Sequence, residues 1–372
     1  MNKDSKIAYF FYPGRKNRIN SNDQSSKEFF YTFMELSNLY NTSLHEVETP
    51  NNIYRLFFKF YDKVIFKLTR LQTNSEKFCD FNYMKLFNSN NTLIFTNFAL
   101  GVSAVPYLLI LNIFKSRKVL VINSGLFSFR ETNLTQKIFR NIYLKLFYLT
   151  VSKIIFTSKA EYLFATQNFK KLRAKFYLNE FCPDFKFWSK NLRISKKDGI
   201  LFIGNDSSRE FTLLEPIAKE FPDIEFTFIS KEPILQKINL NNVKVVSGKW
   251  HSKDISDLEI KKYYEESRLT ILPVKNNLVS SGQSVAMQSM SCKTPVMITD
   301  NIGFWNKEVF THEKEILFVK TNELEEWVNS IKKYYYEDSL LEKIAISAFN
   351  VVSTKYNKET FDKKLLFLLD SN

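Results

Sequence analysis

Residues 280–284, which read Ser-Ser-Gly-Gln-Ser, have the composition of a phosphate-binding turn. A helix is expected to begin at Gln283, because Val285, Met287 and Met290 follow at helical spacing. The free backbone N–H groups and the dipole at such a helix start favour negative charge, and Gly282 lets a ligand approach the backbone. The segment therefore predicts a phosphate site, although an ordinary strand–helix–strand crossover without a ligand would read in the same way.

Two apolar runs must hold this turn in place. Residues 269–273 are short, β-branched at the centre and closed by proline, and residues 295–299 are followed by Asp300, Asn301 and Gly303. Both runs are expected to be strands, so the turn would connect a strand to the helix that leads to the next strand.

The same alternation of strands and helices continues along most of the 372 residues, which are enough for two domains. Alternation of this kind is the signature of parallel α/β domains. Further strands are expected at residues 7–12, 92–96, 118–123, 153–157, 175–181, 200–203, 224–229 and 243–247. Among the 8 glycines, five directly follow an expected strand, where a Rossmann-type sheet needs tight turns: Gly14, Gly125, Gly204, Gly248 and Gly303. From residue 323 onward we expect three amphipathic helices, at 323–336, 340–353 and 358–369, with no strand between them.

The segment around Gly282 resembles the nucleotide-sugar site of the retaining glycosyltransferases of the GT-B fold, the large family 4 group. That family has a strand ending in proline, an acidic residue, a glycine turn, a helix ending in glutamate, and then Ala-Met-Ala-Cys-Gly-x-Pro-Val. The matching positions here are Ser280, Gly282, Gln288 and residues 289–296, which read Ser-Met-Ser-Cys-Lys-Thr-Pro-Val. Residues 182–188 also resemble the family's hinge segment Gly-Val-Asp-x-x-x-Phe, with Asp184 kept and the glycine lost.

The resemblance implies two Rossmann-like domains facing a cleft, with a C-terminal helix that crosses back to the first domain. We expect the first domain at residues 1–187 together with about 356–372, and the nucleotide-sugar domain at 188–355. Residues 195–198 are polar and charged and read as a linker.

The resemblance also implies roles for individual residues. Gln288 would hydrogen-bond the ribose hydroxyls, which a carboxamide can still do. The diphosphate would lie at Ser281, Gly282, Gln283 and Ser284. In the family a glycine-ended strand is followed by a basic residue that contacts the diphosphate, which here corresponds to Gly204, Asn205 and Arg209.

Residues 207–210 are expected to open a helix that runs to Lys219. Arg209 is the best basic candidate, because its rigid fork suits phosphate oxygens, although an arginine on a helix surface would look the same. Arg209 and Ser280 are the candidate catalytic residues. Three departures remove side chains that the family uses. Ser280 replaces the first glutamate, Gln288 replaces the second, and Ser124 replaces a histidine that often lies near the donor.

The net charge of +14 is concentrated in the first half of the chain. Residues 1–190 hold 28 Lys and Arg against 13 Asp and Glu, and the remainder holds 25 against 26. Residues 52–72 and 134–149 place cations among aromatic and aliphatic side chains at helical spacing: Arg55, Lys59, Lys63, Lys67 and Arg70 in the first, and Lys137, Arg140 and Lys145 in the second. Such helices can lie on an anionic membrane surface, and the alternative is a core-facing helix with a solvated charged edge.

The sequence contains few features that indicate a cofactor or a cellular compartment. The three cysteines are odd in number and far apart and the three histidines are isolated, so neither a metal site nor a disulfide framework is expected. The N-terminus has no long apolar region and is not expected to be a signal peptide. We therefore expect a cytoplasmic, peripheral membrane protein that needs no metal or other cofactor.

These observations favour a glycosyltransferase of cell-surface polysaccharide or glycolipid synthesis. It would transfer a sugar from a nucleotide-sugar donor, with retention, to a glycan acceptor that we expect to be lipid-linked. A second hypothesis is a catalytically silent glycosyltransferase-like scaffold, since three expected side chains are lost. Nucleic acid is not an expected partner, because no nucleic-acid-binding module is recognised.

Overall fold

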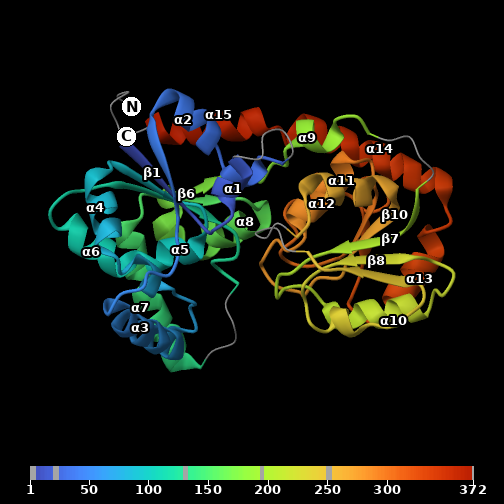
Figure 1. Ribbon diagram of the computed structural model, residues 1–372, viewed down its shortest axis with the longest axis horizontal. Coiled ribbons are helices and arrows are strands. Elements are labelled where there is room, and N and C mark those ends of the chain that lie inside the picture. Colours follow the sequence, from blue (N-terminus) through green and yellow to red (C-terminus); the bar gives the residue numbers. More distant parts are fainter. Residues whose placement is uncertain (1–5, 20–24, 129–132, 193–196, 249–253, 371–372) are drawn as a thin grey trace. The chain divides into compact units, whose positions relative to one another are not determined.

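The computed structural model describes residues 6–19, 25–128, 133–192, 197–248 and 254–370. The chain forms two compact units, each built on its own six-stranded parallel sheet (Figure 1). The first unit comprises Met1–Lys16, Phe30–Asn179 and Asp362–Asn372, and the second comprises Asn17–Phe29 and Glu180–Phe361. The predicted class, α/β with two Rossmann-like domains, is confirmed. The units change over at residue 180, whereas the sequence placed the boundary after residue 187, and the segment Asn17–Phe29 belongs to the second unit.

The first sheet has the strand order β2-β1-β3-β4-β5-β6. Its strands are β1 (Lys6–Phe11), β2 (Asn41–Glu46), β3 (Thr92–Phe95), β4 (Lys118–Asn123), β5 (Lys153–Phe156) and β6 (Phe176–Leu178), of which β2 was not predicted. Side chains of β1 alternate between the two faces, as the period of a strand requires. Ile7, Tyr9 and Phe11 pack in one core, and Phe10 packs against Phe87 and other aromatic rings.

Helices connect these strands in the order that a parallel sheet demands. They are α1 (Arg15–Ile19), α2 (Phe33–Leu39), α3 (Tyr54–Thr69), α4 (Phe81–Ser89), α5 (Phe98–Ser103), α6 (Val105–Asn112), α7 (Leu134–Thr150) and α8 (Lys159–Asn168), with short 3-10 turns η2 (Glu28–Phe30), η3 (Ser75–Phe78) and η4 (Lys170–Lys175). The apolar run 98–114 forms two helices, α5 and α6. No helix among the described residues is both long enough and apolar enough to cross a bilayer.

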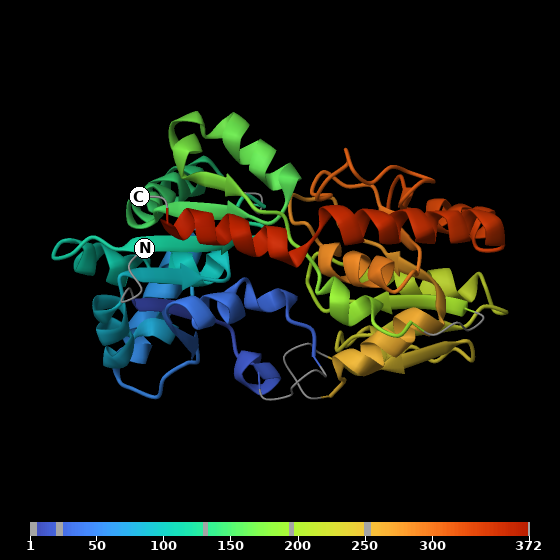
Figure 2. The same cartoon turned by 90° about the horizontal axis from the view of Figure 1, so that it is seen from above.

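The last helix, α15 (Lys358–Asp370), lies beside α2 on one face of the first sheet, and it is the red helix next to the C-terminus in Figure 2. Leu365, Leu368 and Leu369 join the core formed by β1 and α2. Thr32 Oγ1 donates to Asp362 Oδ1 at 2.7 Å, which fixes the start of this contact. The C-terminal helix therefore completes the first unit, as predicted.

The second sheet has the order β12-β11-β10-β7-β8-β9. Its strands are β7 (Asp198–Ile203), β8 (Phe226–Ile229), β9 (Val243–Val246), β10 (Ser267–Leu272), β11 (Val296–Thr299) and β12 (Leu317–Val319), of which β12 was not predicted. The order reverses at β7 and β10, which are neighbours, and in open α/β sheets ligands bind at such a reversal. Of the predicted linker 195–198, residues 195 and 196 lie outside the described residues, and Asp198 begins β7.

Helices cover both faces of the second sheet. They are α9 (Phe185–Ser189), α10 (Leu214–Lys219), α11 (Asp257–Glu266), α12 (Gln283–Ser291), α13 (Leu324–Tyr334) and α14 (Asp338–Lys355), with 3-10 turns η5 (Phe211–Leu213) and η6 (Leu235–Lys237). In Figure 1, α10 and α13 lie on one face and α11 and α12 on the other. Right-handed crossovers produce this division. The crossover through α10 runs from β7 to β8, whereas the crossovers through α11 and α12 run in the opposite direction across the sheet, from β9 to β10 and from β10 to β11.

Candidate functional site

The site is built where β7 and β10 end side by side in the second sheet. The chain beyond β7 pairs with the chain beyond β10, and Arg209 and Val274 form an isolated antiparallel bridge. On either side of it, Glu210 N donates to Pro273 O at 2.9 Å and Lys275 N donates to Ser208 O at 2.8 Å. These backbone bonds fix Arg209 beside the turn that leads into α12.

The Arg209 side chain lies between the two glycine turns. A Cβ atom at Gly204 would lie 2.7 Å from Arg209 Nε, and one at Gly282 would lie 2.8 Å from Nη1. Arg209 is 2% exposed. The prediction that residues 207–210 open a helix is wrong, because the α-helix begins only at Leu214. The alternative of a solvent-exposed arginine on a helix is therefore also wrong.

The hydrogen bonds of this guanidinium are incomplete. Asp206 Oδ2 lies 2.9 Å from Arg209 Nε, and Asp206 Oδ1 accepts from Ser281 Oγ at 2.8 Å. Nη1 has no hydrogen-bond partner among the described residues. Because a buried charged donor without a partner is costly, the guanidinium has capacity for an anion that reaches it.

The start of α12 supplies backbone donors at the same place. Gly282 is the N-cap with φ of +87°, and its C=O accepts from Ala286 N at 2.8 Å. Such a φ suits glycine. Gln283 N donates to Ser280 O at 3.3 Å, and the N–H groups of Ser284 and Val285 have no acceptor within the helix. Ser280, Ser281 and Gln283 are buried around this turn, while Ser284 is half-buried. The structure thus brings Gly204, Arg209 and residues 280–284 together in one place.

Asn205 faces other partners. Its Nδ2 donates to Gly248 O at 2.9 Å, and its Oδ1 accepts from Lys231 N and from Ser230 Oγ. These residues follow β8 and β9, on the side of β7 away from β10. The side chain of Asn205 therefore ties loops together and does not join the group around Arg209.

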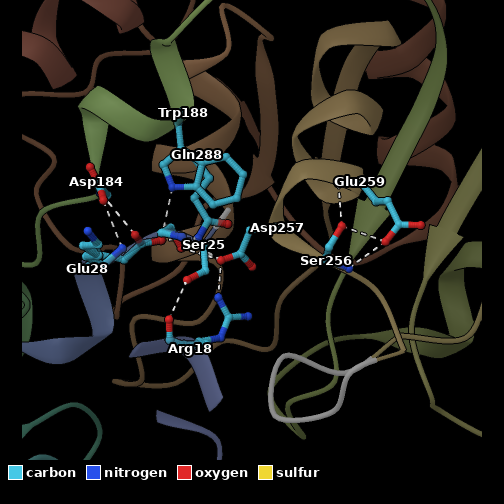
Figure 3. Close-up of polar contacts among 11 residues, drawn as sticks. Arg18, Ser25, Glu28, Asp184, Trp188, Ser256, Asp257, Glu259 and Gln288 are labelled. Carbon is cyan, nitrogen blue, oxygen red and sulfur yellow. Dashed lines mark hydrogen bonds and ion pairs between the residues drawn. The ribbon is translucent and has the colours of Figure 1, made fainter. Parts of the chain in front are cut away.

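Gln288 lies in the second turn of α12 and is 6% exposed. Its Nε2 donates to Glu28 Oε1 at 2.7 Å (Figure 3). Its Oε1 accepts from Tyr264 Oη at 3.1 Å. Glu28 Oε1 also accepts from Trp188 Nε1 at 3.2 Å, and Glu28 Oε2 accepts from Asp184 N at 3.3 Å. A residue predicted to bind ribose is thus held by a carboxylate that is 260 positions away in the sequence.

Two carboxylates, each at the N-terminus of a helix, hold the segment that carries Glu28. Asp257, in the first turn of α11, accepts from Ser26 N at 2.8 Å and from Ser26 Oγ at 3.0 Å, and it also pairs with Arg18. Asp184, the N-cap of α9, accepts from Lys27 N at 3.0 Å. Burial and the nearby charges of Asp184 and Asp257 raise the pKa of Glu28 to about 7, although the hydrogen bond from Gln288 lowers it.

Sequence reasoning missed three residues of this region. Asp206 directly follows Gly204 and Asn205, so its position beside the turn was visible in the sequence. Glu28 and Tyr264 gave no signal, because their contact with Gln288 exists only in the folded chain. Among the described residues, no group of three or more His, Cys, Asp or Glu side chains is arranged to hold a metal ion.

The turn at Ser124, in the first unit, is organised by a buried acid. The Glu161 carboxylate accepts from Gly125 N at 2.8 Å and from Phe127 N at 3.0 Å. Ser124 itself is exposed. The backbone N–H groups that could receive an anion at this turn are therefore occupied by the protein's own carboxylate.

The whole chain is similar in fold to solved glycosyltransferases. Sucrose-phosphate synthase from Thermosynechococcus elongatus matches with a TM-score of 0.69 and 13% identity over 98% of each chain. Anabaena HepE, solved in complex with UDP-glucose, matches with a TM-score of 0.67 and 12% identity over 99% of this chain and 100% of that one. TarM of S. aureus, solved with fondaparinux, alpha-GlcNAc-glycerol and UDP, matches with a TM-score of 0.59 and 15% identity over 75% of this chain and 55% of its own.

No protein-family profile and no curated protein matches the sequence. At these levels of identity the structural matches establish the shared fold, which is that of the GT-B glycosyltransferases.

Proposed function

We propose that this protein is a glycosyltransferase that moves a sugar from a nucleotide-sugar donor to a glycan acceptor. The observation that carries the proposal is the buried Arg209 guanidinium, whose Nη1 is unpaired among the described residues and lies beside Gly282 at the start of α12. A guanidinium and a helix N-terminus that converge on one spot fit the diphosphate of a nucleotide sugar. The fold shared with HepE, which was solved with UDP-glucose, supports the same assignment.

The reaction requires little from the protein beyond stabilisation of the charge that develops on the diphosphate. The bond between the sugar C1 and the diphosphate oxygen breaks, an acceptor hydroxyl oxygen bonds to C1, and its proton leaves with the departing phosphate or to water. Negative charge grows on the diphosphate during this step, where Arg209 and the N–H groups of α12 would stabilise it. We propose retention of configuration, as in the family 4 enzymes that the sequence resembles, and no metal or other cofactor.

Donor binding is tested by a thermal-shift screen with UDP, GDP, ADP and CMP, because a ligand that binds the native state raises the melting temperature. We expect one nucleotide to give a shift that Arg209→Ala abolishes and Arg209→Lys reduces, since lysine keeps the charge but loses the fork. Lys219→Ala, which removes an exposed cation of the same unit, is the matched control and should keep the shift. A shift that survives Arg209→Ala would show that the site lies elsewhere.

A catalytically silent scaffold remains the second candidate, because Ser280 and Ser124 lack the side chains that the related enzymes use there. Incubation with the nucleotide sugar whose nucleotide binds distinguishes the two candidates. Release of the nucleoside diphosphate, by transfer or by hydrolysis, supports the enzyme. Binding with the same Arg209 dependence but no release over many hours supports the scaffold.

We further propose that the acceptor is lipid-linked and that the first unit rests on an anionic membrane surface through α3 and α7. The two helices pack together, with Tyr61 Oη 3.2 Å from Tyr143 Oη. Their outer sides combine exposed cations with exposed apolar side chains: Lys59, Lys63, Lys67, Lys137 and Lys145 with Leu56, Phe57, Phe60, Leu134, Ile138, Ile142 and Leu149. Arg140, which the sequence placed among these cations, is buried. All three cysteines are free, which supports a reducing, cytoplasmic location.

Sedimentation with vesicles that contain phosphatidylserine tests this surface. Reversing Lys59, Lys63 and Lys67 to Glu removes about 1 kcal/mol of attraction per cation, so binding should fall by at least about 100-fold. The matched control reverses Lys170, Lys171 and Arg173, three exposed cations of η4 in the same unit. Equal losses from both triple variants would indicate a general charge effect and would contradict a docking role of α3.

A further inference from the structure

The contact between Glu28 and Gln288 joins the short segment 25–29 to α12. Glu28 is 4% exposed, and its carboxylate accepts three hydrogen bonds, all from N–H donors: Gln288 Nε2, Trp188 Nε1 and Asp184 N. A carboxylate fits three donors because it can only accept, whereas an amide would turn its own N–H groups toward at least one of them. The surroundings of Glu28 are therefore specific for a carboxylate.

Placing a carboxylate there is costly for the fold. Glu28 is buried close to Asp184 and Asp257, so its charge is both desolvated and repelled. The segment is nevertheless held in place by the Ser26 bonds to Asp257 and by the bond from Lys27 N to Asp184. Arrangements that cost stability and yet are firmly held are characteristic of functional sites.

The consequence of this carboxylate is a fixed amide at Gln288. Above its pKa of about 7, Glu28 is ionised and can only accept, so the Nε2 end of Gln288 faces it and the Oε1 end then faces Tyr264 Oη. Among the described residues these contacts use one N–H and one lone pair of the amide. One donor and one acceptor therefore remain, which is the number that two neighbouring hydroxyl groups need.

The position of Gln288 suits such a ligand. It follows Gly282 by six residues on the same helix, a rise of about 9 Å, which is on the scale of one phosphate plus one ribose. We infer that Glu28 is a positioning residue of the nucleotide site, which orients the Gln288 amide toward the two vicinal hydroxyls of the nucleotide ribose. The inference rests on the proposed function, because it needs a diphosphate at the start of α12.

The Glu28 contact also accounts for glutamine at position 288. A carboxylate there would place its oxygen about where Nε2 now lies, 2.7 Å from Glu28 Oε1, and two like charges so close cannot both be ionised. One carboxylate and one amide keep this hydrogen bond with Glu28 ionised, whereas two carboxyl groups would have to share a proton.

The test measures how strongly the full-length protein prefers ribose hydroxyls. Calorimetry at pH 8 measures the affinities for UDP, GDP and ADP, for the 2′,3′-dideoxy form of each, and for inorganic pyrophosphate. The wild type should prefer the ribo form of its nucleotide by at least about tenfold. Glu28→Ala and Gln288→Ala should each remove this preference and leave pyrophosphate affinity unchanged. The double variant should lose nothing more, because Glu28 acts only through Gln288.

Glu28→Gln, which preserves side-chain volume, replaces Glu28→Ala in this test if the alanine variant does not fold. The exchange variant Glu28→Gln with Gln288→Glu keeps one carboxylate and one amide and should regain part of the preference, while Gln288→Glu alone should not. Glu28→Ala that lowers the melting temperature but keeps the preference would overturn the inference and leave Glu28 a purely structural residue. A wild type that binds a nucleotide without preferring its ribo form would also overturn it. A wild type that binds neither nucleotide nor pyrophosphate would overturn the proposed function itself.

Discussion

Two buried charged side chains, Arg209 and Glu28, define the candidate site, and neither is arranged for greatest stability. Arg209 keeps Nη1 unpaired among the described residues, and Glu28 lies close to two other acids. An apolar side chain of similar size would cost the fold less at either position. Their presence is understandable if Arg209 meets a diphosphate and Glu28 orients the amide that meets a sugar hydroxyl.

The pKa of Glu28 predicts how stability depends on pH. The folded-state pKa of about 7 exceeds the value of about 4.5 expected for the unfolded chain, so between these values the folded protein binds the proton more readily. The free energy of unfolding should therefore fall as pH rises from about 4.5 through 7, by up to about 3 kcal/mol. The charges that oppose ionisation are those of Asp184 and Asp257, the latter paired with Arg18.

Urea unfolding followed by tryptophan fluorescence at several pH values checks this prediction. Glu28→Gln removes the titrating group, so the free energy of unfolding of the wild type minus that of the variant should fall as pH rises from about 4.5 through 7. A pH dependence that is the same in both proteins would contradict the raised pKa.

At the residue scale the sequence indicated the components of the phosphate site better than their connections. Gly204, Arg209 and Gly282 were each identified, because a glycine after a strand and an arginine near it are local patterns. Their convergence depends on β7 and β10 being neighbours, which no local pattern reveals. Glu28 opens the short 3-10 turn η2, and nothing local in the sequence indicates that its segment bonds to Asp184 and Asp257, so its role could be seen only in the folded chain.

At the scale of elements, α12 carries the site and both of its ends have left-handed backbone. Gly282 begins the helix with φ of +87°, and Lys293 follows its end with φ of +54°. Thr294 N donates to Ser289 O and Lys293 N donates to Met290 O, which is the Schellman arrangement. That arrangement usually has glycine where this chain has Lys293, and the resembling family has glycine there too.

Lys293→Gly and Lys293→Ala together isolate the cost of that backbone conformation. Both variants lose the contact of Lys293 Nζ with the Phe349 ring, whose centroid is 4.9 Å away. Only glycine adopts the left-handed conformation without steric cost, so Lys293→Gly should be more stable than Lys293→Ala by about 1 kcal/mol. Chemical denaturation of the two variants measures the difference. Equal stabilities would mean that the turn changes its conformation when the lysine is lost.

Most elements were predictable because hydrophobic periodicity and caps are local. The capping box of Ser256 and Glu259 opens α11, and the three C-terminal helices occur as expected. Two errors have the same cause. Residues 207–210 have the composition of a helix start, but the chain beyond β10 draws them into backbone pairing at Val274. The three-residue strand β12 is too short to show a period and forms by pairing with β11.

At the scale of the whole molecule, the chain passes from one unit to the other several times. Asn17–Phe29 leaves the first unit to hold α9, α11 and α12 of the second, and Asp362–Asn372 returns to complete the first. The return of the C-terminal helix was expected from the resemblance alone. The N-terminal exchange could not be read from the sequence, because Ser26, Lys27 and Glu28 are ordinary polar residues until their partners are known.

The C-terminal return predicts that the stability of the first unit depends on α15. Leu365 is fully buried in the core with Ile7, Tyr9 and Leu36, so Leu365→Ala should lower the free energy of unfolding by about 2–5 kcal/mol. Phe367, on the same helix, is 65% exposed, and Phe367→Ala should change the free energy of unfolding by less than about 0.5 kcal/mol.

All 4 tryptophans lie at or beyond residue 188, within the second unit, so their fluorescence reports that unit while circular dichroism reports both. Leu365→Ala should therefore shift the dichroism transition to lower urea and shift the fluorescence transition less. A variant whose two transitions both stay at their wild-type positions would show that α15 is not needed by the first unit's core.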